Sequence, residues 1–93
     1  MSEEKFLTLH PAGKNGVNIL KRRYDFIREY VLKVIKKEKK ITFKELCKRA
    51  ENDLEKTFDG KITWYVVSVK LDLEARGIIE RIPKTSPHEL RMK

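Results

Sequence analysis

This sequence has little of several features that define other classes of protein. Among its 93 residues there is one cysteine, Cys47, so the chain cannot form an internal disulfide. No apolar run approaches the roughly 18 residues that a membrane-spanning helix needs, and residues 1–5 lack the pattern of a secretory signal. From these absences we expect a soluble cytoplasmic protein without membrane association. A chain of this length suits a single domain with one modest core.

Residues suited to catalysis or metal binding are also scarce. The two histidines, His10 and His88, have no Cys, Asp or Glu at metal-ligand spacing. Gly13 and Lys14 are not part of a phosphate-binding loop, because the upstream glycine and the following hydroxyl of that motif are missing. Cys47 has no histidine near it in sequence to act as a base. We therefore predict no catalytic residue, metal, cofactor or small-molecule ligand.

Positive charge is abundant and lies mainly in the first half of the chain. Lys and Arg number 22 against 14 Asp and Glu, which leaves a formal net charge of +8. Residues 1–50 hold 14 basic and 6 acidic side chains, whereas residues 51–93 hold 8 of each. A surface of this kind attracts polyanions. The basic residues cluster at 21–23, at 36–40 and at Lys44, Lys48 and Arg49.

Apolar spacing predicts three helices. The stripe on the first, residues 20–37, contains Leu20, Tyr24, Ile27, Val31, Val34 and Ile35. Phe26 and Tyr30 lie off this stripe and form a second, aromatic surface. The second helix starts at a capping box, residues 42–45, and the third starts at Thr63 and stops at Gly77.

Short β-branched and apolar runs predict the strands. Residues 6–9 form a short strand in an N-terminal arm, residues 1–19. Residues 78–83 and 88–92 form a C-terminal β-hairpin that closes a domain over residues 20–93. The predicted fold class is α+β, mostly α with a small antiparallel hairpin.

The third predicted helix is apolar on two opposite faces. Steps of 100° per residue place Val66, Val69 and Leu73 on one face and Trp64, Val67, Leu71 and Ala75 on the other. The polar groups expected beside the outer face are Tyr65, Ser68 and Asp72. We expect protein to cover the Trp64, Val67 and Leu71 surface. Either the N-terminal arm or a partner chain can provide that cover, and direct stacking of a nucleic-acid base on Trp64 or Tyr65 is a third alternative.

The block Leu73–Arg81 resembles the end of the recognition helix and the first wing strand of winged helix-turn-helix proteins. A leucine lies four positions before the glycine, and a basic residue closes the strand. The resemblance covers about residues 20–93 and implies three helices, a C-terminal wing and nucleic-acid binding. The segment Leu9–Ile19, with its His-Pro-Ala-Gly-Lys-Asn-Gly run, also resembles the start of small uncharacterised bacterial winged-helix proteins. That second resemblance implies no activity.

The leading hypothesis is a winged-helix protein of transcription-regulator type that binds double-stranded DNA, mainly through the phosphate backbone. Its predicted contacts are phosphate binding by Lys40, Lys44, Lys48 and Lys61, groove or base contact by Thr63, Tyr65 and Ser68, and wing contact by Lys84. The outer face of the third helix departs from such DNA readers at Trp64, Leu71 and Asp72.

The alternative hypothesis is a protein-interaction or homodimerisation module that does not bind DNA. Its predicted working surface consists of Trp64, Val67, Leu71, Phe26 and Tyr30. In this case the positive charge mainly keeps the protein soluble.

Overall fold

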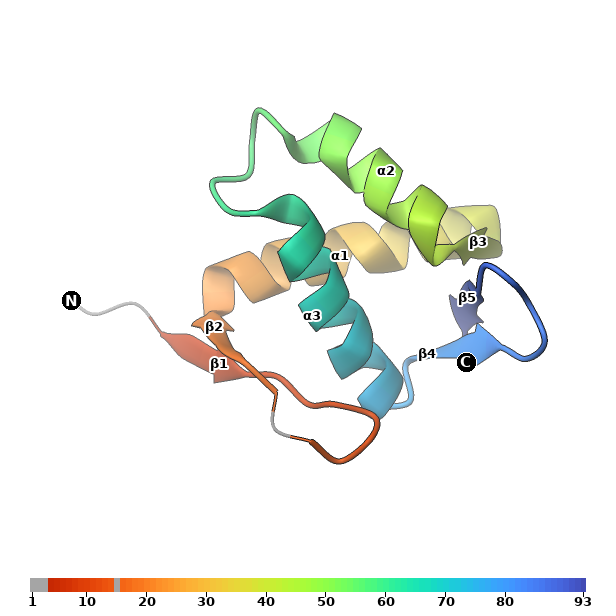
Figure 1. Ribbon diagram of the computed structural model, residues 1–93. Coiled ribbons are helices and arrows are strands. Elements are labelled where there is room, and N and C mark those ends of the chain that lie inside the picture. The colour runs from red at the N-terminus through yellow and green to blue at the C-terminus, as the bar shows by residue number, and fades with distance from the viewer. Residues whose placement is uncertain (1–3, 15) are drawn as a thin grey trace.

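Three helices and two small antiparallel sheets make up an α+β fold in the computed structural model, which describes residues 4–14 and 16–93 (Figure 1). The elements in chain order are β1 (Lys5–Leu7), β2 (Asn18–Leu20), α1 (Lys21–Glu38), β3 (Lys40–Thr42), α2 (Phe43–Leu54), α3 (Ile62–Ala75), β4 (Ile79–Ile82) and β5 (Glu89–Met92). The predicted fold class and the three predicted helices are confirmed at this level.

The core lies where α3 packs against both α1 and α2 (Figure 1). The predicted stripes supply it, because helical spacing brings their apolar side chains to one side of each helix. The fully buried members are Ile27, Val31 and Ile35 of α1, Leu46 and Ala50 of α2, and Val66, Val69 and Leu73 of α3. One face of α3 is therefore core, as its sequence predicts.

The C-terminal hairpin forms as predicted, but it belongs to a larger sheet. β5 lies between β4 and β3 in an antiparallel sheet of strand order β3-β5-β4. The sequence reading places no strand between the first two helices, so it misses β3. Three residues are too few to show the alternation of a strand, and β3 exists because Ile41 pairs with Leu90, far along the chain.

The N-terminal arm folds into a second small sheet. β1 pairs antiparallel with β2, with Phe6 opposite Ile19. The predicted strand at residues 6–9 is shifted to Lys5–Leu7, and β2, which runs across the predicted boundary at residue 19, was not predicted. Thr8 and Gly16 meet closely in the connection, where a Cβ on Gly16 would lie 1.9 Å from the Thr8 carbonyl oxygen. Only glycine fits at that position.

The caps of the helices agree with the sequence at two ends and differ at one. Thr42 caps α2 by accepting a hydrogen bond from the Glu45 N–H at 3.1 Å, and Gly77 stops α3 with a positive φ of 73°. The predicted start of the third helix at Thr63 is wrong. α3 begins at Ile62, and the Thr63 hydroxyl donates to the carboxylate of Glu51 on α2.

Candidate functional site

The outer face of α3 carries the predicted apolar stripe. Trp64 is 45% exposed, and Val67 and Leu71 are partly buried. On one flank the connection between β1 and β2 packs against this stripe, and it encloses a small cavity of about 70 Å³ with Leu71 and Ser68. Figure 1 shows this connection passing close to the C-terminal half of α3. The arm of the same chain therefore covers part of the face, and Trp64 stays accessible.

The polar residues expected beside that outer face point elsewhere. Asp72 is fully buried and Ser68 is 9% exposed, while the Tyr65 hydroxyl accepts a hydrogen bond from Arg23 Nη1 of α1 at 2.8 Å. The prediction that these three groups line the solvent face is wrong. Positions 65, 68 and 72 share one helical stripe, and that stripe packs against α1 and the arm instead of facing solvent.

Asp72 is the centre of a buried polar network. One carboxylate oxygen accepts from the Leu9 backbone N–H at 2.8 Å, and the other accepts from the Tyr24 hydroxyl and from Arg76 Nε, the latter at 2.9 Å. Burial and the bond to Asp72 raise the pKa of Tyr24 to about 12. Phe6 stacks on Tyr24 with 4.1 Å between ring centroids, and the Arg76 guanidinium lies over the Phe6 ring. These contacts hold the arm against α1 and α3 of its own chain.

The lysines predicted to contact phosphate include one group that the fold brings to a single end of the molecule. The C-terminal end of α1, β3 and the N-terminal end of α2 meet there, beside the turn between β4 and β5 (Figure 1). This basic edge, as we call it, consists of the exposed residues Lys36, Lys37, Lys39, Lys40, Lys44 and Lys48.

The acidic residues next to the basic edge do not neutralise its lysines. Arg49 binds the carboxylates of Glu38 and Glu45, with its Nη1 3.0 Å from Glu38 and its Nε 3.3 Å from Glu45. The bond from Arg49 lowers the pKa of Glu38. Within the part of the chain that the structure describes, no basic-edge lysine forms an ion pair. The edge therefore has uncompensated positive charge.

The other predicted phosphate contacts, Lys61 and Lys84, lie on elements outside the basic edge. Lys61 is exposed at the start of α3, and Lys84 is exposed in the hairpin turn, where its φ is 63°. Thr63, predicted to touch a groove, is exposed but bonded to Glu51. Of the predicted DNA contacts, the structure thus groups Lys40, Lys44 and Lys48 beside the turn that contains Lys84, and it places Lys61 and Thr63 at the start of α3.

The two α1 residues predicted for a partner interface have contacts of their own. Phe26 is 42% exposed and stacks on Phe58 at 5.7 Å between centroids. The Tyr30 hydroxyl donates to Asp53 of α2 at 2.6 Å, and burial raises the pKa of Tyr30. These side chains thus contact α2 and the connection after it, and Phe58 in turn contacts Tyr65 of α3.

A buried cation, Lys70, joins α3 to the start of α2, which the sequence does not reveal. Lys70 is 4% exposed, lies over the Phe43 ring and has its Nζ 3.0 Å from Glu74. The ring of His88 stacks on the same Phe43 ring. Burial lowers the pKa of His88, and the positive charge of Lys70 lowers it further. The signal that could have revealed this cluster is the i, i+4 spacing of Lys70 and Glu74.

Two hollows flank Trp64 at the start of α3. One, of about 430 Å³, is lined by Arg23, Gly60, Lys61, Trp64 and Tyr65. The other, of about 470 Å³, shares Gly60, Lys61 and Trp64 and adds Glu51, Glu55, Phe58, Ile62 and Thr63. The first hollow combines cations with aromatic rings, whereas the second contains two carboxylates.

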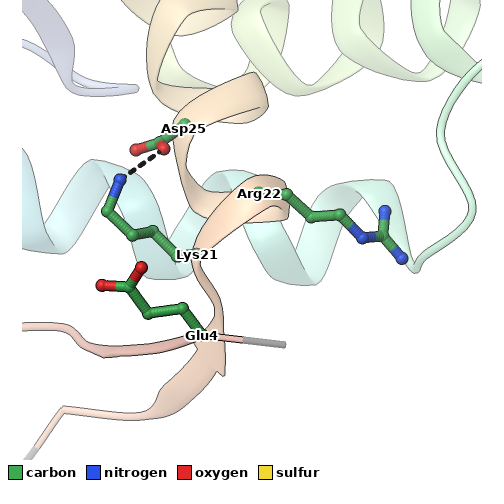
Figure 2. Close-up of a pocket in the computed structure, with 4 residues that line it drawn as sticks. All are labelled: Glu4, Lys21, Arg22 and Asp25. Atoms are coloured by element: carbon green, nitrogen blue, oxygen red, sulfur yellow. Dashed lines mark hydrogen bonds and ion pairs between the residues drawn. The ribbon is translucent and has the colours of Figure 1, made fainter. Parts of the chain in front are cut away.

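A further hollow, of about 250 Å³, lies where the arm meets the start of α1 and is lined by Glu4, Lys21, Arg22 and Asp25 (Figure 2). The Lys21 Nζ is 2.8 Å from Asp25, while the side chain of Arg22 extends in the opposite direction. The bond from Asp25 raises the pKa of Lys21. Two acids balance two bases here, so the hollow has no net charge with which to attract an ion.

The remaining predictions concern metals, thiols and membranes. Among residues 4–14 and 16–93, no group of three or more His, Cys, Asp or Glu side chains is placed to hold a metal ion. Cys47 is partly buried. Burial raises the pKa of its thiol, and the negative charge of Glu51 raises it further. In the same described ranges, no helix has both the length and the apolar character needed to span a membrane.

Comparison with known proteins gives one family. Neither the curated proteins nor the solved structures yielded a match. One family model, described as a family of unknown function (DUF6958), matches residues 5–90. That range includes the arm, all three helices and most of the hairpin, and the chain accordingly belongs to the DUF6958 family.

Proposed function

We propose that this protein is a winged-helix domain that binds double-stranded DNA through phosphate contacts, as a regulator of transcription would, and not by reading bases. The element order α1-β3-α2-α3-β4-β5 and the strand order β3-β5-β4 support the winged-helix assignment. In this assignment α3 is the recognition helix and the β4–β5 hairpin is the wing.

One observation carries the proposal: the basic edge has lysines with no recorded ion pair within the described residues. Lys44 and Lys48 lie one helical turn apart on α2, and Lys40 precedes that helix directly. Cations spaced in this way can follow a phosphate backbone and release its condensed counterions, which drives association. The proposed contacts are Lys40, Lys44 and Lys48, with Lys84 of the wing turn as an additional contact.

The outer face of α3 argues against base readout. Sequence-specific winged helices present hydrogen-bonding side chains to the major groove. Here the corresponding face presents Trp64, Val67 and Leu71, and the hydroxyl of Ser68 lies under the arm. We therefore expect affinity for duplex DNA that depends on salt and only weakly on sequence.

Fluorescence anisotropy tests the proposal directly. The full chain is titrated into labelled random duplex DNA, single-stranded DNA and duplex RNA at several salt concentrations. Duplex binding with a log–log salt slope of several charges is the expected result, and the affinity changes little when the duplex sequence is permuted. Absence of binding at low salt would overturn the proposal.

A second candidate function is a protein interface on the outer face of α3, with the positive charge serving solubility. The exposure of Trp64 at 45%, next to Val67 and Leu71, favours it, because large exposed aromatic groups are enriched in interfaces. Sedimentation of the wild type and of Leu71→Glu separates the cases. An assembly that dissociates in the folded variant supports the interface, and two monomers of equal size contradict a homodimer.

A further inference from the structure

The first hollow beside Trp64 brings together two kinds of group that bind nucleotides. Its lining consists of the cationic side chains of Arg23 and Lys61, the rings of Trp64 and Tyr65, and Gly60. A volume of about 430 Å³ falls within the usual range for small-molecule sites. None of the residues in this lining is acidic.

The walls of this cleft are held in place by contacts within the protein. Trp64 and Tyr65 meet edge to face, with 4.9 Å between centroids and 83° between planes. The Tyr65 ring also packs edge-on against Phe58, and its hydroxyl is held by Arg23. A Cβ on Gly60 would lie 2.7 Å from the Tyr65 ring and 2.8 Å from the Phe58 ring. The close approach therefore requires glycine, and the cleft is largely preformed.

Charge in the cleft favours an anion. Asp59 lies nearby, but Arg22 and Arg23 both bind it, at 3.2 and 3.1 Å, and these bonds lower its pKa. Arg23 donates from Nη1 to Tyr65 and from Nη2 to Asp59, and its Nε is buried, so Arg23 contributes to the cleft mainly through its positive charge. In the described part of the chain Lys61 forms no ion pair. Lys61 is therefore the exposed cation available to a phosphate, and Arg23 adds positive charge beside it.

Trp64 provides the aromatic part of the site. Nearly half of its surface is accessible, and it forms the wall between the cationic cleft and the hollow that contains Glu51 and Glu55. An indole next to a cation is the combination on which proteins stack unpaired bases, since every base has a π face. The acidic hollow on the other side discourages a phosphate from entering there.

We propose that this cleft binds an unstacked nucleotide, with the base on Trp64 and the phosphate between Lys61 and Arg23. The ligand is either a free nucleotide or an unpaired nucleotide within a strand, because both present a base and an adjacent phosphate. The site is distinct from the basic edge, and this inference goes beyond the proposed duplex binding.

Trp64 is the sole tryptophan of the chain, so its fluorescence reports on this cleft directly. The full-length protein is titrated with adenosine monophosphate, with a short single strand of deoxyadenylate and with inorganic phosphate, with free tryptophan as the inner-filter control. Saturable quenching by the mononucleotide assigns a free nucleotide, and quenching by the strand alone assigns an unpaired nucleotide. Either result supports the site. Absence of quenching by both, or equal effects of phosphate, overturns it.

Calorimetry with variants locates the binding. Trp64→Ala should lower the affinity for the ligand that quenches the wild type by about fivefold or more, because the stacking contact is lost. Lys61→Ala should weaken it and, for a strand, reduce the salt slope by about 0.7. Lys14→Ala, an exposed lysine on the arm, is the matched control and should change nothing. Equal losses in the control and in Lys61→Ala would contradict the site.

One further variant separates this inference from the proposed function. The combined Lys40→Ala, Lys44→Ala, Lys48→Ala protein should lose affinity for duplex DNA and retain nucleotide quenching of Trp64. If duplex binding fails in the wild type while quenching is present, the proposed function is wrong and the nucleotide site stands. If quenching is absent while duplex binding is present, the nucleotide site is wrong and the proposed function stands.

Discussion

The Asp72 carboxylate accepts a hydrogen bond from the Leu9 backbone N–H at 2.8 Å, across 63 positions of sequence. The same side chain accepts from the Tyr24 hydroxyl and from Arg76. One fully buried carboxylate thus joins the arm, α1 and α3. A group placed in this way acts as an internal tie, since without it the Tyr24 hydroxyl would be buried without a partner.

Asp72→Ala should lower the free energy of unfolding by about 3 kcal/mol, because it leaves buried donors and a partly buried Arg76 without their acceptor. Urea denaturation followed by circular dichroism measures the change. Asp25→Ala is the control, since its ion pair with Lys21 is largely exposed and should contribute little. A loss no greater than that of the control would show that Asp72 is not a structural tie.

Alkaline pH should weaken the fold through Tyr24. Its pKa is raised from 10.0 to about 12, so the folded state favours the protonated phenol. The stabilisation is complete below about pH 10 and is lost as pH rises through about 12. Thermal denaturation across this range, compared between wild type and Tyr24→Phe, measures it. The two curves should converge at high pH, and parallel curves would contradict the assignment.

Acid should weaken the fold through His88. Burial lowers its pKa from 6.5, and Lys70 and Arg81 add to this effect. The folded state therefore favours the neutral ring, and its contribution is present above pH 6.5 and lost as pH falls through the lowered pKa. The difference in unfolding free energy between wild type and His88→Gln should shrink on acidification. A difference that is constant with pH would exclude this role.

Removal of the basic-edge lysines should weaken duplex DNA binding. Each lost phosphate contact reduces the log–log salt slope by about 0.9, so Lys40→Ala, Lys44→Ala and Lys48→Ala together should reduce it by nearly three. Anisotropy titrations at several salt concentrations measure the slope.

The matched control for that variant removes the same charge from other exposed positions, Lys5, Lys14 and Lys56. It should retain most of the slope, and sedimentation should give the same size for both proteins. Equal reductions in the two variants would mean that net charge, not the basic edge, determines binding.

Gly60→Ala should destabilise the protein by about 1–3 kcal/mol, because the new Cβ would overlap the Tyr65 and Phe58 rings. It should also lower the affinity for the ligand that quenches Trp64, since those rings form and support the walls of the cleft. Thermal denaturation and calorimetry measure the two effects. Unchanged stability together with unchanged quenching would show that the rings move apart at no cost.

Sequence and structure diverge most at α3. Periodicity correctly assigned Val66, Val69 and Leu73 to the core, and it correctly grouped Trp64 with Leu71 on the opposite face. It did not reveal that Asp72 is buried, because a charged side chain is ordinarily assigned to solvent. The donors that allow its burial come from Leu9 and from Tyr24.

The candidate nucleotide cleft could not be predicted either. Its members come from α1, from the connection after α2 and from the first turn of α3. Nothing in the spacing of Arg23 and Lys61 along the chain indicates that both line one hollow. The single hint in the sequence is Trp64 itself, for which burial by the arm, a protein interface and stacking on a nucleic-acid base are all open alternatives.

The sequence by itself determined the helices, the cap at Thr42, the stop at Gly77 and the hairpin. These features depend on residues within a few positions of one another, where hydrogen-bond geometry and helical spacing act locally. Only the tertiary structure decided the strands β2 and β3, the burial of Asp72 and the grouping of the basic-edge lysines at one end of the molecule. Each of those outcomes depends on partners far apart in the chain, which meet only when the core has assembled.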